Sequence, residues 1–113
     1  MSELHLPSAQ LEALRHILAS RLPVGVKIQV FGSRATGIGL KSHSDLDLLI
    51  VGPEKLPVLL LVDLREALSE SDLPFSVNIV EAQYVEPEFL ASLEELGTVE
   101  LRLVSNTLQK YLY

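Results

Sequence analysis

The residues of this chain best suited to chemistry are a Gly-Ser turn and the pair of aspartates that follows it after a short loop. Residues 31–37 read FGSRATG and residues 44–50 read SDLDLLI. Asp45 and Asp47 occupy alternate positions of an apolar run, and in a strand such residues point to the same face. Two adjacent carboxylates repel each other unless a cation lies between them. The pattern predicts Mg²⁺, because this ion favours oxygen ligands and the phosphates of a substrate.

Two familiar phosphate-binding patterns do not fit the glycine turn. Gly32 and Gly37 have the spacing of a Walker loop, but Ile38 stands where that loop requires lysine. A dinucleotide-binding fingerprint needs a third glycine at the start of a helix, and Ser42 takes that place in a loop that leads to a strand. The sequence therefore excludes both of these sites.

Asp47 is the residue that a purely structural explanation accounts for least well. Asp45 could end a polar loop, and a plain turn could explain a glycine followed by a serine. Asp47 lies inside the apolar run, where an unpaired charge costs about several kcal/mol or is lost by protonation. We therefore take Asp47 as the first candidate for a functional residue.

The spacing of apolar residues predicts the elements that position these groups. Ser8 is the expected cap of the first helix. Helices are predicted over residues 8–21, 57–69 and 87–96, and strands over 26–31, 45–51, 75–80 and 99–103, with a turn or first helical turn at 32–36. This order predicts an α+β fold, a small mixed sheet with helices packed on it, in one domain of residues 1–113.

Composition narrows the classes of function. The net charge of −6 argues against general nucleic-acid binding. Residues 1–53, which include the turn, are the less acidic half, with five Lys or Arg against four Asp or Glu; residues 54–113 have four against eleven. That balance makes the first half the better place for a phosphate.

Location and partners are also constrained by the composition. The longest aliphatic stretch, residues 56–62, is too short to cross a bilayer. The chain shows no targeting peptide and no cysteine, so we expect a cytoplasmic protein without disulfides or thiolate metal sites. Hydrophobic residues make up 48% of the chain and surround the predicted helix at 58–62. We therefore expect an apolar surface that meets a partner.

The glycine turn and the aspartate pair, taken together, resemble the nucleotidyltransferase superfamily related to DNA polymerase beta. The resemblance is to its smallest bacterial form, the minimal nucleotidyltransferases. It is carried by residues 31–37 and 44–48 and extends to residues 69–74 before the third strand. It implies the polymerase beta-like fold and transfer of a nucleoside monophosphate to a hydroxyl, with release of pyrophosphate. The expected donor is ATP or another nucleoside triphosphate.

The resemblance also implies a role for each motif residue. Asp45 and Asp47 would hold one or two Mg²⁺ ions that bridge the phosphate oxygens. Gly32 would let the backbone approach the triphosphate, because it has no Cβ. Ser33 would hold the β or γ phosphate, and Arg34 would neutralise phosphate charge. For Arg34, an ordinary solvated surface position is the alternative.

One position departs from the family pattern. Relatives carry a third carboxylate on the next core strand, as a ligand of the second metal and a base for the attacking hydroxyl; Asn78 stands here instead. An amide can offer its carbonyl oxygen to Mg²⁺ but cannot take a proton. Glu81 is three residues further along the strand and is expected on the opposite face. His43, in the loop before Asp45, is a second candidate for the base, although a solvated loop position explains it more simply.

Two functions therefore stay open. In the first, the protein is an active nucleotidyltransferase that moves AMP to a hydroxyl of a protein or small molecule, with Asp45, Asp47 and Asn78 as its catalytic residues. In the second, it is a nucleotide-binding or partner-binding module that has lost the chemistry. The resemblance further implies a partner, because minimal nucleotidyltransferases are often paired with an all-helical HEPN-domain protein in toxin–antitoxin modules. A homodimer is the alternative.

Overall fold

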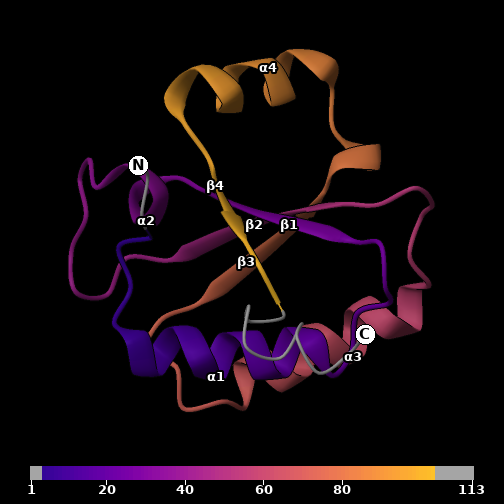
Figure 1. Ribbon diagram of the computed structural model, residues 1–113, viewed down its shortest axis with the longest axis horizontal. Helices are drawn as coiled ribbons and strands as arrows, with labels where there is room; N and C mark the ends of the chain where they lie inside the picture. The colour runs from indigo at the N-terminus through magenta and orange to yellow at the C-terminus, as the bar shows by residue number, and fades with distance from the viewer. Residues whose placement is uncertain (1–3, 104–113) are drawn as a thin grey trace, which may run out of the picture.

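A four-stranded mixed sheet organises the chain in the computed structural model, which describes residues 4–103 (Figure 1). The elements in chain order are α1 (Ser8–Ala19), β1 (Lys27–Phe31), α2 (Ser33–Thr36), β2 (Leu46–Val51), α3 (Val58–Ser69), β3 (Val77–Glu81), the 3-10 helix η1 (Ala82–Tyr84), α4 (Pro87–Leu96) and β4 (Val99–Leu101). This order confirms the predicted α+β class. α1 and β4 each end two residues before the predicted boundary.

The strands lie in the order β3-β2-β1-β4. β1 pairs antiparallel with both β2 and β4, whereas β2 and β3 are parallel. A parallel pair needs a crossover connection, and α3 supplies it between β2 and β3. β2 therefore has a strand on either side, and the groups at its N-terminal end face neighbours from both.

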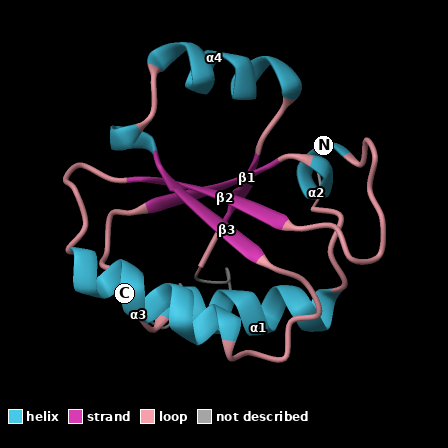
Figure 2. Cartoon of the chain, turned by 180° about the vertical axis from the view of Figure 1, so that it is seen from behind, coloured by secondary structure: helices cyan, strands magenta, loops and turns pink. Residues whose placement is uncertain are grey.

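Helices cover both faces of the sheet: α1 and α3 lie on one side and α4 on the other (Figures 1 and 2). The largest completely buried side chains come from α1, α3 and the first two strands and include Leu14, Leu18, Ile28, Leu48 and Leu64. Strand alternation places Leu46, Leu48 and Ile50 of β2 in this core. The odd-numbered residues of β2, Asp47 among them, consequently face the side of α4.

Two predicted boundaries are wrong for local reasons. Ser8 is the first residue of α1 and not its cap, because Pro7, with φ −57° and ψ 143°, already precedes the helix and accepts a hydrogen bond of its first turn. β3 begins at Val77, two residues later than predicted. Phe75 is buried instead against the guanidinium of Arg34.

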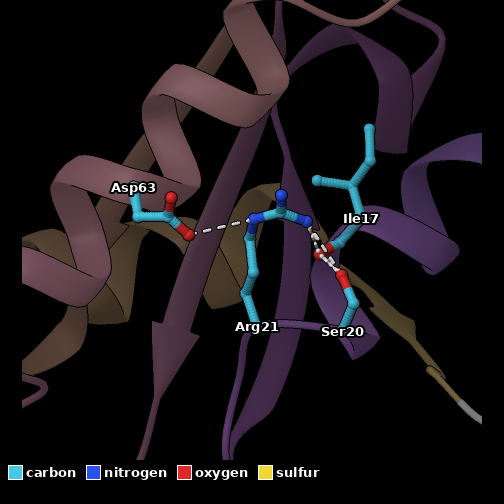
Figure 3. Close-up of polar contacts among 4 residues, drawn as sticks. All are labelled: Ile17, Ser20, Arg21 and Asp63. Carbon is cyan, nitrogen blue, oxygen red and sulfur yellow. Dashed lines mark hydrogen bonds and ion pairs between the residues drawn. The ribbon is translucent and has the colours of Figure 1, made fainter.

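A surface ion pair links the segment just after α1 to α3 (Figure 3). Arg21 Nε donates to Asp63 Oδ2 at 3.1 Å, and its Nη1 donates to Ser20 Oγ at 2.8 Å and to the Ile17 carbonyl at 3.4 Å. The Asp63 side chain is 66% exposed, so the pair contributes at most about 1 kcal/mol to stability.

The helix α3 is apolar around much of its circumference, as the sequence predicts. Leu61, Leu64 and Leu68 are buried, whereas Val58 and Leu59 are exposed. Apolar side chains therefore remain on the surface of α3. No helix between residues 4 and 103 is long and apolar enough to span a membrane.

Candidate active site

The pairing of β2 with β3 brings together the three side chains predicted to be catalytic. Asp47 lies opposite Asn78 in the parallel pair, and Asp45 directly precedes β2. Asn78 Nδ2 is 2.9 Å from Asp47 Oδ1 and 3.4 Å from Asp45 Oδ2. The two carboxylates therefore converge on one amide at the end of the sheet.

The backbone of Gly32 lies directly against Asp47. Gly32 has φ +75°, and a Cβ built on it would lie 2.6 Å from Asp47 Oδ2, closer than real Cβ atoms approach another atom. Its carbonyl accepts the N–H groups of Ala35 and Thr36, both at 3.0 Å. Only glycine combines this backbone conformation with this close approach. The glycine turn and the aspartate pair, predicted from sequence as neighbours, are in contact.

Ser33 is the first residue of α2 and directly follows Gly32, the residue that contacts the Asp47 carboxylate. Together with Gly32 it lines a cavity that extends toward the end of α4. Its hydroxyl and backbone N–H are the kind of donors that bind phosphate oxygens. Its position agrees with the predicted phosphate contact, which stays a prediction.

The side chain of Arg34 does not join the other predicted site residues. It is only 4% exposed, so the alternative of a solvated surface charge is wrong. Its Nε donates to the carbonyl of Ser44 at 3.1 Å, its Nη1 to that of His5 at 3.1 Å and its Nη2 to that of Ser42 at 3.4 Å. The guanidinium also lies 4.3 Å from the centre of the Phe75 ring. These contacts occupy the group that the sequence assigned to phosphate.

The Arg34 contacts fix the loop that leads to Asp45. Ser44 is held by the guanidinium and also accepts the N–H of Lys41 on its hydroxyl at 2.8 Å. On the other side of Asp45, the N–H of Leu46 donates to the Ser76 carbonyl at 2.9 Å. Both neighbours of Asp45 are therefore anchored, so Arg34 is better described as a positioning residue than as a phosphate ligand. Sequence reasoning missed this network, because its partners come from separate segments.

Glu81 and His43 take no part in the hydrogen bonds that join Asp45 and Asp47 to Asn78. Glu81 is the last residue of β3, pairs opposite Ile50, and accepts the N–H of Leu56 on its Oε2 at 3.5 Å. His43 is exposed in the loop before β2. Asn78 is therefore the third side chain beside the two aspartates, where the resemblance implies a third carboxylate.

The donor set fits one Mg²⁺ ion. Among the residues that the structure describes, no group of three or more His, Asp or Glu is arranged to hold a metal, so an ion at this site would have two carboxylate ligands, Asp45 and Asp47. The amide of Asn78 donates to the carboxylates of Asp45 and Asp47 and so places partial positive charge between them. A cation in the same place would neutralise the two carboxylates fully. Turning this amide about its terminal bond presents its carbonyl oxygen instead. Two carboxylates balance one divalent ion and leave a second poorly neutralised.

Comparison with known proteins identifies relatives of this chain. Residues 11–105 match the protein family described as nucleotidyltransferase domain. A relative from Haemophilus influenzae, named probable protein adenylyltransferase MntA, is 36% identical over 98 residues, which make up 87% of this chain and 84% of the relative.

Solved structures share the fold. A chain from a toxin–antitoxin crystal structure with AMP-PNP superimposes with a TM-score of 0.61 at 19% identity, covering 91% of this chain and 78% of that one. A chain from the complex of a tri-AMPylated Shewanella oneidensis HEPN toxin with its MNT antitoxin gives a TM-score of 0.59 at 18% identity, covering 93% and 77%. At such identities the likeness concerns the arrangement of helices and strands.

Proposed function

This chain belongs to the nucleotidyltransferase domain family, and from that premise we propose that it transfers AMP from ATP to a hydroxyl of a protein in a Mg²⁺-dependent reaction. The strongest support is the convergence of Asp45, Asp47 and Asn78 beside a glycine that touches Asp47. The name of the Haemophilus influenzae relative supports the adenylyl group and the protein acceptor.

Asp45, Asp47 and the carbonyl oxygen of Asn78 would hold the ion, which supplies charge neutralisation at the phosphate oxygens when it is bound. The missing side chain of Gly32 makes room for the Asp47 carboxylate, and Ser33 donates hydrogen bonds to the oxygens of the triphosphate. These groups orient the α-phosphorus for in-line attack by the acceptor hydroxyl, so positioning and charge neutralisation provide most of the catalysis.

The reaction forms a bond between the acceptor oxygen and the α-phosphorus and breaks the bond to the pyrophosphate oxygen. The proton of the attacking hydroxyl passes to solvent water, since the amide of Asn78 cannot accept it. We therefore expect slower transfer than a third carboxylate would allow.

Asn78 also supports a second candidate, a module that binds nucleotide and partner without transferring AMP. The two candidates share the metal and nucleotide site and differ only in the chemical step. Binding of Mg²⁺-ATP without any transfer is therefore the result that would favour the second.

We further propose that the acceptor and partner is a HEPN-domain protein. The support is the fold shared with a chain of the complex between a HEPN toxin and its MNT antitoxin. The apolar side chains exposed on α3 provide a surface of the kind that a partner covers. A homodimer through the same surface is the alternative.

Transfer of label from ATP carrying ³²P at the α-phosphate tests the enzyme hypothesis, with a co-expressed HEPN protein as acceptor. We expect Mg²⁺-dependent labelling by the wild type and none by Asp47→Asn. Asp63→Asn is the matched control, because Asp63 is an exposed carboxylate on α3. If the wild type and Asn78→Asp both bind Mg²⁺-ATP and neither labels any acceptor, the transferase assignment is refuted.

A further inference from the structure

The outer edge of β3 has backbone groups that no other described strand pairs with. β3 is the last strand in the order β3-β2-β1-β4, and Figure 2 shows no described element along its outer side. The N–H of Leu46 donates to the carbonyl of Ser76, so the backbone groups of Ser76 face β2. Successive residues of a strand turn these groups to opposite sides, so those of Val77 and Ile79 face away from β2. Within residues 4–103 they have no hydrogen-bond partner.

The sequence of β3 does little to keep another strand away from this edge. Exposed sheet edges are commonly protected by short strands, charged side chains or proline. The opposite edge strand, β4, has three residues with Glu100 at its centre. β3 has five residues, Val-Asn-Ile-Val-Glu, without proline or lysine and with its one charge at the last position. A row of unpaired backbone donors and acceptors at this spacing is complementary to another extended polypeptide.

The outer edge of β3 is continuous with the candidate active site. Asn78 belongs to β3 and contacts both Asp45 and Asp47. Neighbouring strands lie about 4.8 Å apart, and side chains opposite each other share a face. A residue of an added strand opposite Asn78 would therefore point to the same side of the sheet as Asn78 and Asp47.

We propose that an extended segment of the acceptor protein pairs with the outer edge of β3 and so presents its hydroxyl to the aspartates. The backbone of the segment supplies the hydrogen bonds to Val77 and Ile79, and the residue opposite Asn78 carries the hydroxyl. This docking mode rests on the proposed function, because it presupposes a hydroxyl that reacts beside Asp45 and Asp47.

A cavity of about 250 Å³ at the start of β3 indicates a further property of the segment. It is lined by Ser76 and Val77 at the edge and by Arg65 and Ser69 of α3. Among the described residues, no carboxylate forms an ion pair with Arg65. Val77 packs against the core, on the face opposite to Asn78, so the residue next to the hydroxyl residue would point toward this cavity. We expect that neighbour to be Asp or Glu, which complements Arg65.

Amide hydrogen exchange of the wild-type protein, followed by NMR, tests the pairing. In the free protein, the amides of Val77 and Ile79 should exchange freely, whereas those of Asn78 and Val80, which face β2, should be protected. With the co-expressed HEPN protein bound, exchange at Val77 and Ile79 should slow by more than about tenfold. Unchanged exchange at both amides in the complex would overturn the assignment. Slow exchange in the free protein would also overturn it, because a second copy or another segment would then occupy the edge.

The substitution Arg65→Gln tests the acidic neighbour, with Lys27→Gln as the matched control at an exposed cation of β1. We expect Arg65→Gln to label the acceptor about fivefold more slowly and to bind Mg²⁺-ATP as the wild type does. The control should change neither property, and wild-type labelling by Arg65→Gln would refute the acidic neighbour.

Two outcomes separate this docking mode from the proposed function. Failure of the wild type to bind Mg²⁺-ATP would overturn the proposed function itself. Intact Mg²⁺-ATP binding without a HEPN complex would overturn the edge of β3 as the docking site of that acceptor and leave the nucleotide site standing.

Discussion

Replacing Arg34 with methionine removes the guanidinium and keeps an unbranched apolar side chain of similar length. The three hydrogen bonds to the carbonyls of His5, Ser42 and Ser44 are lost. A hydrogen bond from a charged group contributes about 1.5–3 kcal/mol, but one of these is long at 3.4 Å, and water can reach part of the loop. With the contact to Phe75 weakened, we expect the free energy of unfolding to fall by about 3–4 kcal/mol.

Urea unfolding followed by circular dichroism measures this change. Arg34→Lys should recover part of the loss, because a single ammonium cannot reproduce the fork of donors. Arg21→Met is the control, since it breaks a surface ion pair and should cost at most about 1 kcal/mol.

The same substitution should affect the proposed metal site. Without the hydrogen bond from Arg34 to its carbonyl, Ser44 no longer holds the adjoining Asp45 in place. We therefore expect the affinity for Mg²⁺-ATP to fall about tenfold. Calorimetry at a temperature where the variant is still folded measures this affinity. A variant as stable as the wild type, with the same Mg²⁺-ATP affinity, would show that Arg34 neither supports the loop nor positions Asp45.

Three further substitutions test other parts of the structure. Gly32→Ala should displace the Asp47 carboxylate and strain the backbone. We expect the free energy of unfolding, measured with urea, to fall by about 1–3 kcal/mol, and Mg²⁺ binding, measured by calorimetry, to be lost. Normal Mg²⁺ affinity would contradict the close contact between Gly32 and Asp47. Asn78→Asp should lower the melting temperature in the absence of Mg²⁺, because three carboxylates then repel each other, and should increase the rise in melting temperature that Mg²⁺ produces. Thermal melts with and without the ion measure both effects. If Asn78 lies outside the site, the rise produced by Mg²⁺ will be the same as in the wild type. Leu59→Glu on α3 should abolish co-purification with a HEPN partner while leaving ATP binding intact, whereas unchanged co-purification would place the partner elsewhere.

The predictions that the structure confirms rest on the order of apolar and polar residues within single segments. Alternation of apolar residues in 26–31 and a near-continuous apolar run in 45–51 located β1 and β2 to within one residue at each end. The same alternation placed Asp45 and Asp47 on one face, and Asn78 indeed contacts both. Such predictions succeed because a strand has a period of two wherever it lies, so side-chain direction follows from position along the chain.

The role of Arg34 could not be predicted from the residues around it, because it depends on contacts with distant segments. Its charge and its place after the Gly-Ser pair were compatible with phosphate binding or with the surface. Its actual partners include the carbonyl of His5 and the ring of Phe75, which the chain brings together only after it folds. A buried arginine with backbone acceptors has no signature in the sequence around it.

By itself, the sequence determined which residues are candidates for a metal site and that the two aspartates share a face, because these follow from residue type and strand period. Only the tertiary structure decided that Gly32 touches Asp47, that Arg34 anchors the loop before Asp45, and that an apolar cavity adjoins the Gly-Ser turn. These features arise where β1, β2, α2 and α4 meet. Their geometry depends on how distant segments pack, which no single segment encodes.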